Sequence, residues 1–334
     1  YSYICVMFHP IDTITPESLR ELMNSYGSSR RPFVWGIDYG LRRGFFLDRP
    51  YEAGRILWQM GNAGNCSGMS HDTAPRLSVT APPTADEYAI MFARIRGGLM
   101  RGDSFLANLT ARTLVECDAT LRDVFLASRA PFRLLLGEEF VCFSPEAFVA
   151  IDHDLISTYP MKGTIDASLP DAAETLRDNH KELCEHYTIV DLMRNDLNRV
   201  AGEVEVKRFR YFEEIVTHSG SILQTSSEIS GRLPARLVGR YGDILLPLLP
   251  AGSITGAPKP ATVSLIDSAE TSPRGWYTGV FGHFDGRRMV SAVMIRCLQR
   301  DTDGRLYFHS GGGITVNSDC TEEYSELLTK IYLS

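Results

Sequence analysis

The chain has 334 residues, 44% of them hydrophobic and 22% charged, which is an ordinary globular composition for one large domain or two. Its formal net charge is −7 and no cluster of five or more Lys or Arg residues occurs, so we expect no nucleic-acid partner. Apolar runs fall far short of a bilayer span and no signal segment follows Tyr1, so the sequence predicts a cytoplasmic chain without membrane contact. Seven scattered cysteines without a C-x-x-C pair predict reduced thiols.

Residues 1–83 are predicted to form an N-terminal β-containing segment that is integrated into the same fold as residues 84–334. Short β-like runs at Tyr3–Phe8 and Pro32–Asp38 precede a patch rich in Gly, Asn and Ser at Gly61–Ser70. From Thr84 onward, amphipathic helical stretches alternate with β-rich ones.

The second region begins with an amphipathic helix. Its apolar residues, which should face the core, are Tyr88, Met91, Phe92 and Ile95. Six β-like runs follow, at Phe132–Leu136, Phe140–Phe143, Val204–Tyr211, Tyr277–Phe284, Arg288–Ile295 and Leu306–His309. The mixture predicts an α+β fold with sheets covered by helices.

Lys162 stands between a proline and a glycine in Pro160–Thr164, where a backbone turn can hold its amine. Such an amine acts as a nucleophile only where a partly desolvated site or a cationic neighbour lowers its pKa. A solvated loop lysine is the alternative, and an isolated Lys-Gly pair favours it.

Two predicted helices each carry a pair of glutamates three residues apart. One helix starts near Pro170 with Ser168 as its N-cap and runs to about Asn195, and the other starts with the capping sequence Asp319–Glu322. The paired glutamates, each pair on one helix face, are Glu182 with Glu185 and Glu323 with Glu326. Four converging carboxylates with waters suit magnesium, and two solvated helix faces are the alternative.

Glycine-rich segments at Pro250–Lys259 and Gly311–Gly313 allow the backbone to approach a ligand closely. In the first, Ser253, Thr255 and free amides can bind an anion. Neither segment matches the phosphate-binding P-loop or the dinucleotide motif, and each by itself is a turn signal.

Nine ordered blocks combine these signals between about Glu87 and Lys330. They are Phe143–Glu146, Pro160–Thr164, Glu185–Asp196, Val216–His218, Pro250–Lys259, Arg274–Gly279, Ile295–Arg296, Gly311–Ile314 and Glu323–Lys330. On these blocks the chain resembles the chorismate-utilising enzymes, the family of anthranilate synthase component I. The resemblance implies a sandwich of two large antiparallel sheets flanked by helices, with residues 84–334 as the chorismate-binding catalytic domain.

Lys162 makes the resemblance more specific. The aminodeoxychorismate synthase component I branch carries lysine there, where anthranilate synthases carry alanine. Isochorismate and salicylate synthases carry a water-activating lysine in the strand that here reads Gly102–Leu109, which has none. The resemblance therefore implies amination of chorismate to 4-amino-4-deoxychorismate, on the route to 4-aminobenzoate and folate. Leu106 departs from the polar residue common at its position.

The resemblance also implies the roles of individual residues. Lys162 would be the nucleophile, Glu146 the acid at the departing hydroxyl, and His218 a group that orients the ring or relays a proton. The residues implied to bind chorismate are Thr255, Tyr277, Arg296, Gly312, Gly313 and Lys330, and Mg²⁺ would be held by Glu182, Glu185, Glu323 and Glu326. Structural roles for these side chains remain open alternatives.

The resemblance implies that ammonia comes from a separate glutamine amidotransferase subunit. A tryptophan regulatory site, known in some members with a longer N-terminal portion, is not expected. Two alternatives stay open: anthranilate synthesis, which shares every block except Lys162, and a non-catalytic chorismate-binding protein.

Overall fold

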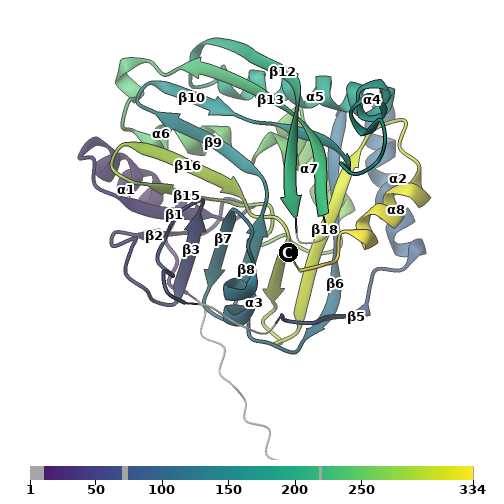
Figure 1. The fold of residues 1–334 in the computed structure, drawn as a ribbon, viewed down its shortest axis with the longest axis horizontal. Coiled ribbons are helices and arrows are strands. Elements are labelled where there is room, and N and C mark those ends of the chain that lie inside the picture. Colours follow the sequence, from purple (N-terminus) through teal and green to yellow (C-terminus); the bar gives the residue numbers. More distant parts are fainter. Residues whose placement is uncertain (1–10, 70–73, 218–219, 334) are drawn as a thin grey trace, which may run out of the picture.

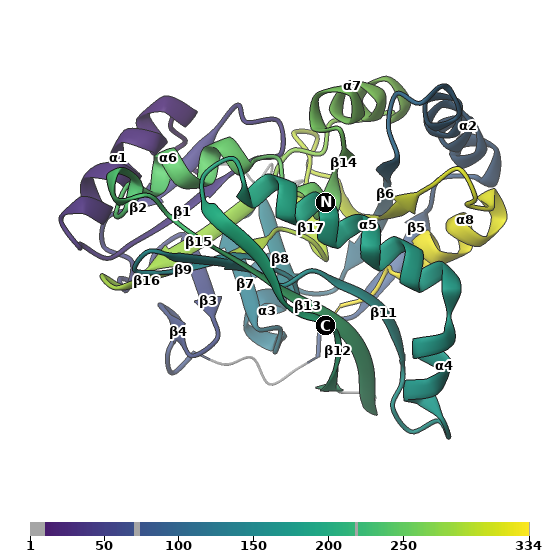
Figure 2. The same ribbon diagram turned by 90° about the horizontal axis from the view of Figure 1, so that it is seen from above.

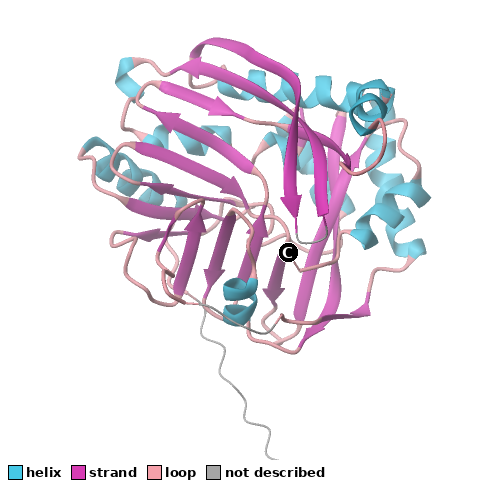
Figure 3. Cartoon of the chain, in the orientation of Figure 1, coloured by secondary structure: helices cyan, strands magenta, loops and turns pink. Residues whose placement is uncertain are grey.

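The computed structural model describes residues 11–69, 74–217 and 220–333, and it contains two large antiparallel sheets flanked by helices (Figures 1 and 3). This arrangement confirms the predicted α+β sandwich. The helices in the described residues are α1 (Pro16–Ser28), α2 (Ala85–Arg101), α3 (Leu121–Ala127), α4 (Ala172–Asp178), α5 (His180–Leu197), α6 (Tyr241–Leu245), α7 (Lys259–Ala269) and α8 (Cys320–Thr329). None of these is long and apolar enough to cross a bilayer.

The first sheet runs in the order β11-β13-β10-β9-β16-β15-β1-β2, with β12 paired to β13. Its strands are β1 (Phe33–Ile37), β2 (Gly44–Leu47), β9 (Ala147–Asp152), β10 (Leu155–Thr158), β11 (Met161–Asp166), β12 (Gly202–Thr217), β13 (Gly220–Arg232), β15 (Val280–Phe284) and β16 (Arg288–Val293). Strands distant in sequence therefore lie side by side, since β1 pairs with β15.

The second sheet runs in the order β14-β6-β18-β17-β8-β7-β3-β4, with β5 paired to β6. Its strands are β3 (Ile56–Met60), β4 (Ala63–Gly64), β5 (Leu77–Ala81), β6 (Leu106–Cys117), β7 (Phe132–Leu136), β8 (Phe140–Ser144), β14 (Gly256–Ala257), β17 (Cys297–Arg300) and β18 (Leu306–Ile314). The described part of the N-terminal segment contributes β1 and β2 to the first sheet and β3 to β5 to the second. A boundary at residues 83 and 84 stays a prediction.

Helices cover the outer faces of both sheets (Figure 2). α1 and α6 pack together beside β1, and α5 lies over β11 to β13. On the other sheet α2, α7 and α8 gather beside β6 and β18, and α3 packs on β7 and β8. The molecule thus has four layers, helix, sheet, sheet and helix.

Alternate residues of the central strands enter different cores. In β1, Trp35 and Ile37 pack under the helices of the first sheet, whereas Val34 faces the core between the sheets. In β7, Leu134 faces the same inter-sheet core and Leu135 faces α3. Because both faces of these strands are buried, their sequences read as continuous apolar runs.

The helix predicted after Thr84 is confirmed as α2. Thr84 caps it in a capping box with Glu87, and Gly102 ends it with a left-handed φ of 82°. All four residues predicted for its apolar face, Tyr88, Met91, Phe92 and Ile95, are buried. Asp319 caps α8 by accepting from the amides of Thr321 and Glu322, which confirms the predicted start of this helix but not a reciprocal capping box.

The single helix predicted from Pro170 to Asn195 is wrong, because the chain forms α4 and α5 with a break at Asn179. The Asn179 backbone is extended, and its side chain accepts from the amide of Glu182 to cap α5. Ser168 is not an N-cap, since its hydroxyl donates to Asp166 and α4 begins after Asp171.

Most predicted strands are confirmed, and two need comment. The run Tyr277–Phe284 begins too early: Thr278 has a φ of 60°, so the chain turns there and β15 starts at Val280. The predicted run Tyr3–Phe8 lies outside the described residues.

Candidate active site

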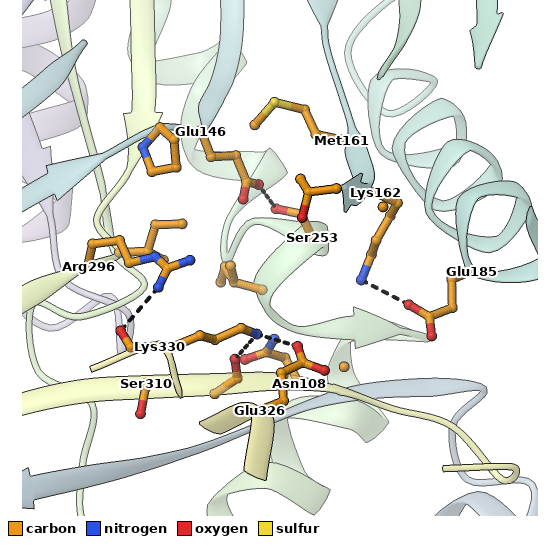
Figure 4. Close-up of a pocket in the computed structure, with 18 of the residues that line it drawn as sticks. Asn108, Glu146, Met161, Lys162, Glu185, Ser253, Arg296, Ser310, Glu326 and Lys330 are labelled. Carbon is orange, nitrogen blue, oxygen red and sulfur yellow. Dashed lines mark hydrogen bonds and ion pairs between the residues drawn. The ribbon is translucent and has the colours of Figure 1, made fainter. Parts of the chain in front are cut away.

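A cavity of about 600 Å³ lies where the two sheets approach each other, and residues from both sheets line it. Pro145 and Glu146 reach it from the end of β8, and Lys162 from β11. From the second sheet β18 contributes its glycine-rich end, Gly311 to Gly313. α5 and α8 add their glutamates from two sides. Segments far apart in sequence therefore build one chamber (Figure 4).

Lys162 projects into this cavity from a strand rather than from the predicted turn. Its Nζ lies 3.4 Å from Oε2 of Glu185, and 24% of its side chain is exposed. The pairing of β11 with β13 shifts between Lys162 and Thr164, and Gly163 has a φ of 73°. A Cβ at Gly163 would stand 2.9 Å from Leu176, so glycine fits the bulge by backbone conformation and by space.

Glu146 lies across the cavity from Lys162, and its carboxyl group accepts a hydrogen bond of 2.5 Å from the hydroxyl of Ser253 (Figure 4). Burial raises the pKa of Glu146, while the Ser253 hydroxyl and the positive charge of Lys162 oppose that rise. A buried carboxyl with a raised pKa suits a proton donor. His218, the third predicted catalytic residue, lies outside the described residues.

All four predicted metal-binding glutamates line the cavity, as two separated pairs. Glu185 bonds to Lys162, and Glu326 lies 2.6 Å from Nζ of Lys330. A Cβ at Gly312 would stand 3.3 Å from Glu323, which places that carboxylate beside the β18 backbone. Among the described residues, no three His, Cys, Asp or Glu side chains gather as a metal-binding group.

Five of the six residues predicted to bind substrate line the cavity: Tyr277, Arg296, Gly312, Gly313 and Lys330. Arg296 donates to the carbonyl oxygen of Lys330 over 3.1 Å, and its guanidinium lies over the ring of Tyr332. Burial raises the pKa of Tyr277, so its hydroxyl stays protonated and can donate.

Thr255, the sixth residue predicted to bind substrate, is not among the residues that line the cavity. Its side chain is fully buried and its hydroxyl donates to the carbonyl oxygen of Ala251, so Ser253 and Ile254 line the cavity instead. The predicted anion role of Ser253 also changes, since its hydroxyl is engaged by Glu146.

Leu106 lies close to the nucleophile. A Cβ at Gly313 would meet Leu106 at 3.2 Å and Nζ of Lys162 at 3.6 Å, so the three residues meet at one point.

Sequence reasoning missed His309, which lines the cavity from β18. Its ring centroid lies 4.9 Å from that of Tyr277, and burial together with Arg112 and Arg274 lowers its pKa to about 3. The imidazole is therefore neutral at physiological pH. A lone histidine in an apolar strand gave no signal that would have found it.

Two buried ion pairs support the cavity wall from behind. Arg274 pairs with Glu270 at 2.7 Å and donates to the carbonyl oxygens of Ile254 and Asn108, both of which belong to lining residues. Lys259 pairs with Asp196 at 2.7 Å, which joins the start of α7 to the end of α5. These contacts fix the loop that carries Ser253.

Comparison with known proteins agrees with this architecture. The family described as chorismate binding enzyme matches residues 59–333. The chain is 46% identical over 321 residues to an "uncharacterized PabA-like protein" of Haemophilus influenzae, which covers 96% of this chain and 97% of that protein. It is 34% identical over 263 residues to aminodeoxychorismate synthase component 1 of Escherichia coli, covering 74% of this chain and 56% of that protein.

Among solved structures, anthranilate synthase component I from Streptococcus pneumoniae is similar, with a TM-score of 0.64 and 26% identity. The match covers 79% of this chain and 60% of that chain. A family match over most of the chain, an identity of 46% over nearly its full length and the shared fold lead to one conclusion. The chain belongs to the family of chorismate-binding enzymes.

Proposed function

We propose that the chain is an aminodeoxychorismate synthase component I, which aminates chorismate at C4. The observation that carries the proposal is the primary amine of Lys162 inside a cavity that also presents Glu146. A nucleophile and a raised-pKa acid that face one cavity are the two groups that replacement of a ring hydroxyl requires. The similarity to the E. coli synthase supports it.

In the first step the neutral amine of Lys162 attacks ring carbon C2 as the C4–O bond breaks. The departing hydroxyl takes the proton of Glu146 and leaves as water. Ammonia then bonds to C4 while the C2–N bond breaks, which releases Lys162 as an amine. The new ammonium group returns one proton to Glu146, so the cycle closes with chorismate and ammonia converted to aminodeoxychorismate and water.

In the structure Nζ of Lys162 is held 3.4 Å from Oε2 of Glu185, away from an attacking position. The amine must therefore leave Glu185 and lose its proton before it attacks.

The positively charged side chains of the cavity suit the enolpyruvyl carboxylate of chorismate. Arg296 can hold one carboxylate with two parallel hydrogen bonds, and Lys330 adds a second positive charge. The Tyr277 hydroxyl and the amides of Gly312 and Gly313 offer neutral donors.

The glutamates of α5 and α8 fit magnesium by their chemistry, since they supply only oxygen donors to one cavity. Glu182, Glu185, Glu323 and Glu326 would hold the ion. When bound, it would supply positive charge for the ring carboxylate. Two of these carboxylates bond to lysines in the structure, so ion binding requires Glu185 and Glu326 to turn away from Lys162 and Lys330.

Ammonia would come from a glutamine amidotransferase subunit. The chain does contain one G-x-C-x-G sequence, Gly64–Gly68, the pattern of a cysteine nucleophile elbow. Its Cys66 is 7% exposed and its thiol contacts Gln59, and the next described element is β5 rather than a helix. Cys66 is therefore a buried, packed thiol rather than an exposed nucleophile. Release of ammonia from glutamine would take place on the partner subunit.

Product identification tests the proposal. The purified chain is incubated with chorismate, magnesium and excess ammonium, with and without an aminodeoxychorismate lyase, and products are identified by mass spectrometry. Aminodeoxychorismate that turns into 4-aminobenzoate only with the lyase is the expected result. Anthranilate with pyruvate would overturn it in favour of anthranilate synthesis, and untouched chorismate would favour a binding role.

A further inference from the structure

Ser253 stands at the centre of a short 3-10 turn, Gly252–Ile254, on the cavity wall. Its hydroxyl donates to Oε1 of Glu146 over 2.5 Å, although the two residues are 107 positions apart in the chain. Figure 4 shows the two side chains meeting at one side of the cavity. No partner of Oε2 of Glu146 is found among the described residues, so this oxygen is left to the cavity contents.

The turn that carries Ser253 is fixed on both sides. A Cβ at Gly252 would stand 2.4 Å from Met193 and 2.8 Å from Asp196, so the backbone lies directly on α5. Arg274 binds the carbonyl oxygen of Ile254, and the hydroxyl of Thr255 binds that of Ala251. The backbone of Ser253 is therefore held in place independently of Glu146.

Few charges act on the Glu146 carboxyl. The titratable and charged groups that share its cavity are Lys162, Glu182, Glu185, Tyr277, Arg296, His309, Glu323, Glu326, Lys330 and Tyr332. Only Lys162 among them contributes to the pKa of Glu146, which burial raises and which Ser253 and Lys162 lower. Among the described residues, Ser253 thus supplies the side-chain hydrogen bond that stabilises the ionised carboxylate.

We propose that Ser253 is a positioning residue that holds Oε1 of Glu146, so that Oε2 faces the hydroxyl that leaves the substrate. This inference rests on the proposed function and names the group that orients its acid. A carboxyl group rotates freely about its last bond unless one oxygen is bound. Without the hydrogen bond from Ser253, the Glu146 carboxyl group adopts several orientations, and only one of them is productive. The proton therefore reaches the leaving oxygen less often.

Steady-state kinetics of Ser253→Ala and Ser253→Thr test the inference. Removal of the hydroxyl should lower kcat about ten- to a hundredfold with KM nearly unchanged, because Ser253 contacts Glu146 rather than substrate. Threonine keeps the hydroxyl and should restore most of kcat. A rise in KM with kcat unchanged would overturn the proposal and indicate direct substrate binding.

A double-variant cycle with Glu146→Gln separates positioning from general damage. If Ser253 acts through Glu146, Ser253→Ala should lower kcat by less than about twofold when Glu146 is already replaced by Gln. Equal losses in both backgrounds would overturn the proposal. Ser268→Ala is the matched control, since that hydroxyl donates to the Leu265 carbonyl oxygen within α7 and its loss should leave kcat unchanged.

A titration of Glu146 that needs no turnover tests the role of Ser253 separately from the proposed function. Carbon-13 NMR of chain labelled at the glutamate carboxyls, with Glu146→Gln to assign the signal, follows the ionisation of Glu146. Ser253→Ala removes a donor to the carboxylate, so the midpoint should rise, and the alkaline limb of kcat/KM should move to higher pH with it. An unchanged midpoint would overturn the role of Ser253, whereas a wild-type chain that makes no aminodeoxychorismate would overturn only the proposed function.

Discussion

Lys162, Gly163 and Leu106 together decide the chemistry at the nucleophile. The β-bulge at Gly163 directs the Lys162 side chain into the cavity, and Leu106 lies beside its amine. We predict that Lys162→Ala lowers aminodeoxychorismate formation by about 10³-fold or more, because the variant lacks the amine that would form the covalent intermediate. Product formation by mass spectrometry under excess ammonium measures the loss.

Intact-protein mass checks the covalent step at the same residue. With chorismate and no ammonia, the wild-type chain should gain the mass of chorismate less water, and Lys162→Ala should gain nothing. Lys207→Ala is the matched control, because this lysine is exposed and pairs with Glu205 on the surface. Undiminished activity in Lys162→Ala would rule out the covalent role.

At the scale of elements, the buried ion pair between Lys259 and Asp196 joins α7 to α5. Both side chains are about nine-tenths buried, and burial raises the pKa of Asp196 and lowers that of Lys259. Lys259→Met leaves a buried carboxylate without its cation, so we predict a loss of about 3–5 kcal/mol in the free energy of unfolding at neutral pH. Urea unfolding of the two chains measures it.

The loss of unfolding free energy in Lys259→Met should become smaller as the pH falls. In Lys259→Met the folded-state pKa of Asp196 lies above its unfolded value, so its contribution to stability is fully present below the unfolded pKa, near 3.9. That contribution is lost as the pH rises through the raised folded-state pKa. The variant should therefore be closer to wild type at pH 5 than at pH 8, and an equal difference at both would contradict the prediction.

An exposed ion pair gives the matched control for this comparison. Arg232 and Asp154 are 60% and 47% exposed, so Arg232→Met should cost less than about 1 kcal/mol at either pH.

At the scale of the whole molecule, the cavity takes residues from both sheets, so a ligand that fills it should bind only the folded chain. We predict that chorismate with magnesium raises the Tm. At a ligand concentration of 100 Kd, binding should add about 2.7 kcal/mol to the free energy of unfolding. The four glutamates at the cavity make the effect depend on magnesium, so chorismate with a chelator should give a smaller shift. Differential scanning fluorimetry measures both.

A variant of one glutamate tests whether these carboxylates bind magnesium. Glu323→Gln removes one carboxylate from the cavity and should reduce the shift that magnesium adds, whereas Glu203→Gln, on an exposed side chain, should leave it unchanged. The same shift with and without chelator would contradict the magnesium site.

Features that depend on neighbouring residues could be read from the sequence. The capping box of Thr84 and Glu87 and the apolar face of α2 follow from spacings of three and four residues, and both are found in the structure. Strand β7 matches its predicted bounds, Phe132–Leu136, because an apolar run between turns is a local signal. The break at Asn179 was missed, since the periodicity of α5 continues across it.

The candidate site divides in the same way. The sequence by itself determined the family, the lysine between proline and glycine, and the glutamate pairs one helical turn apart, because motif and spacing lie within short segments. Only the tertiary structure decided that Ser253 bonds to Glu146, that Lys162 pairs with Glu185, that His309 enters the cavity and that Thr255 does not. These outcomes depend on how two sheets and the loops between them pack, and contacts between residues so far apart leave no periodic trace in the sequence.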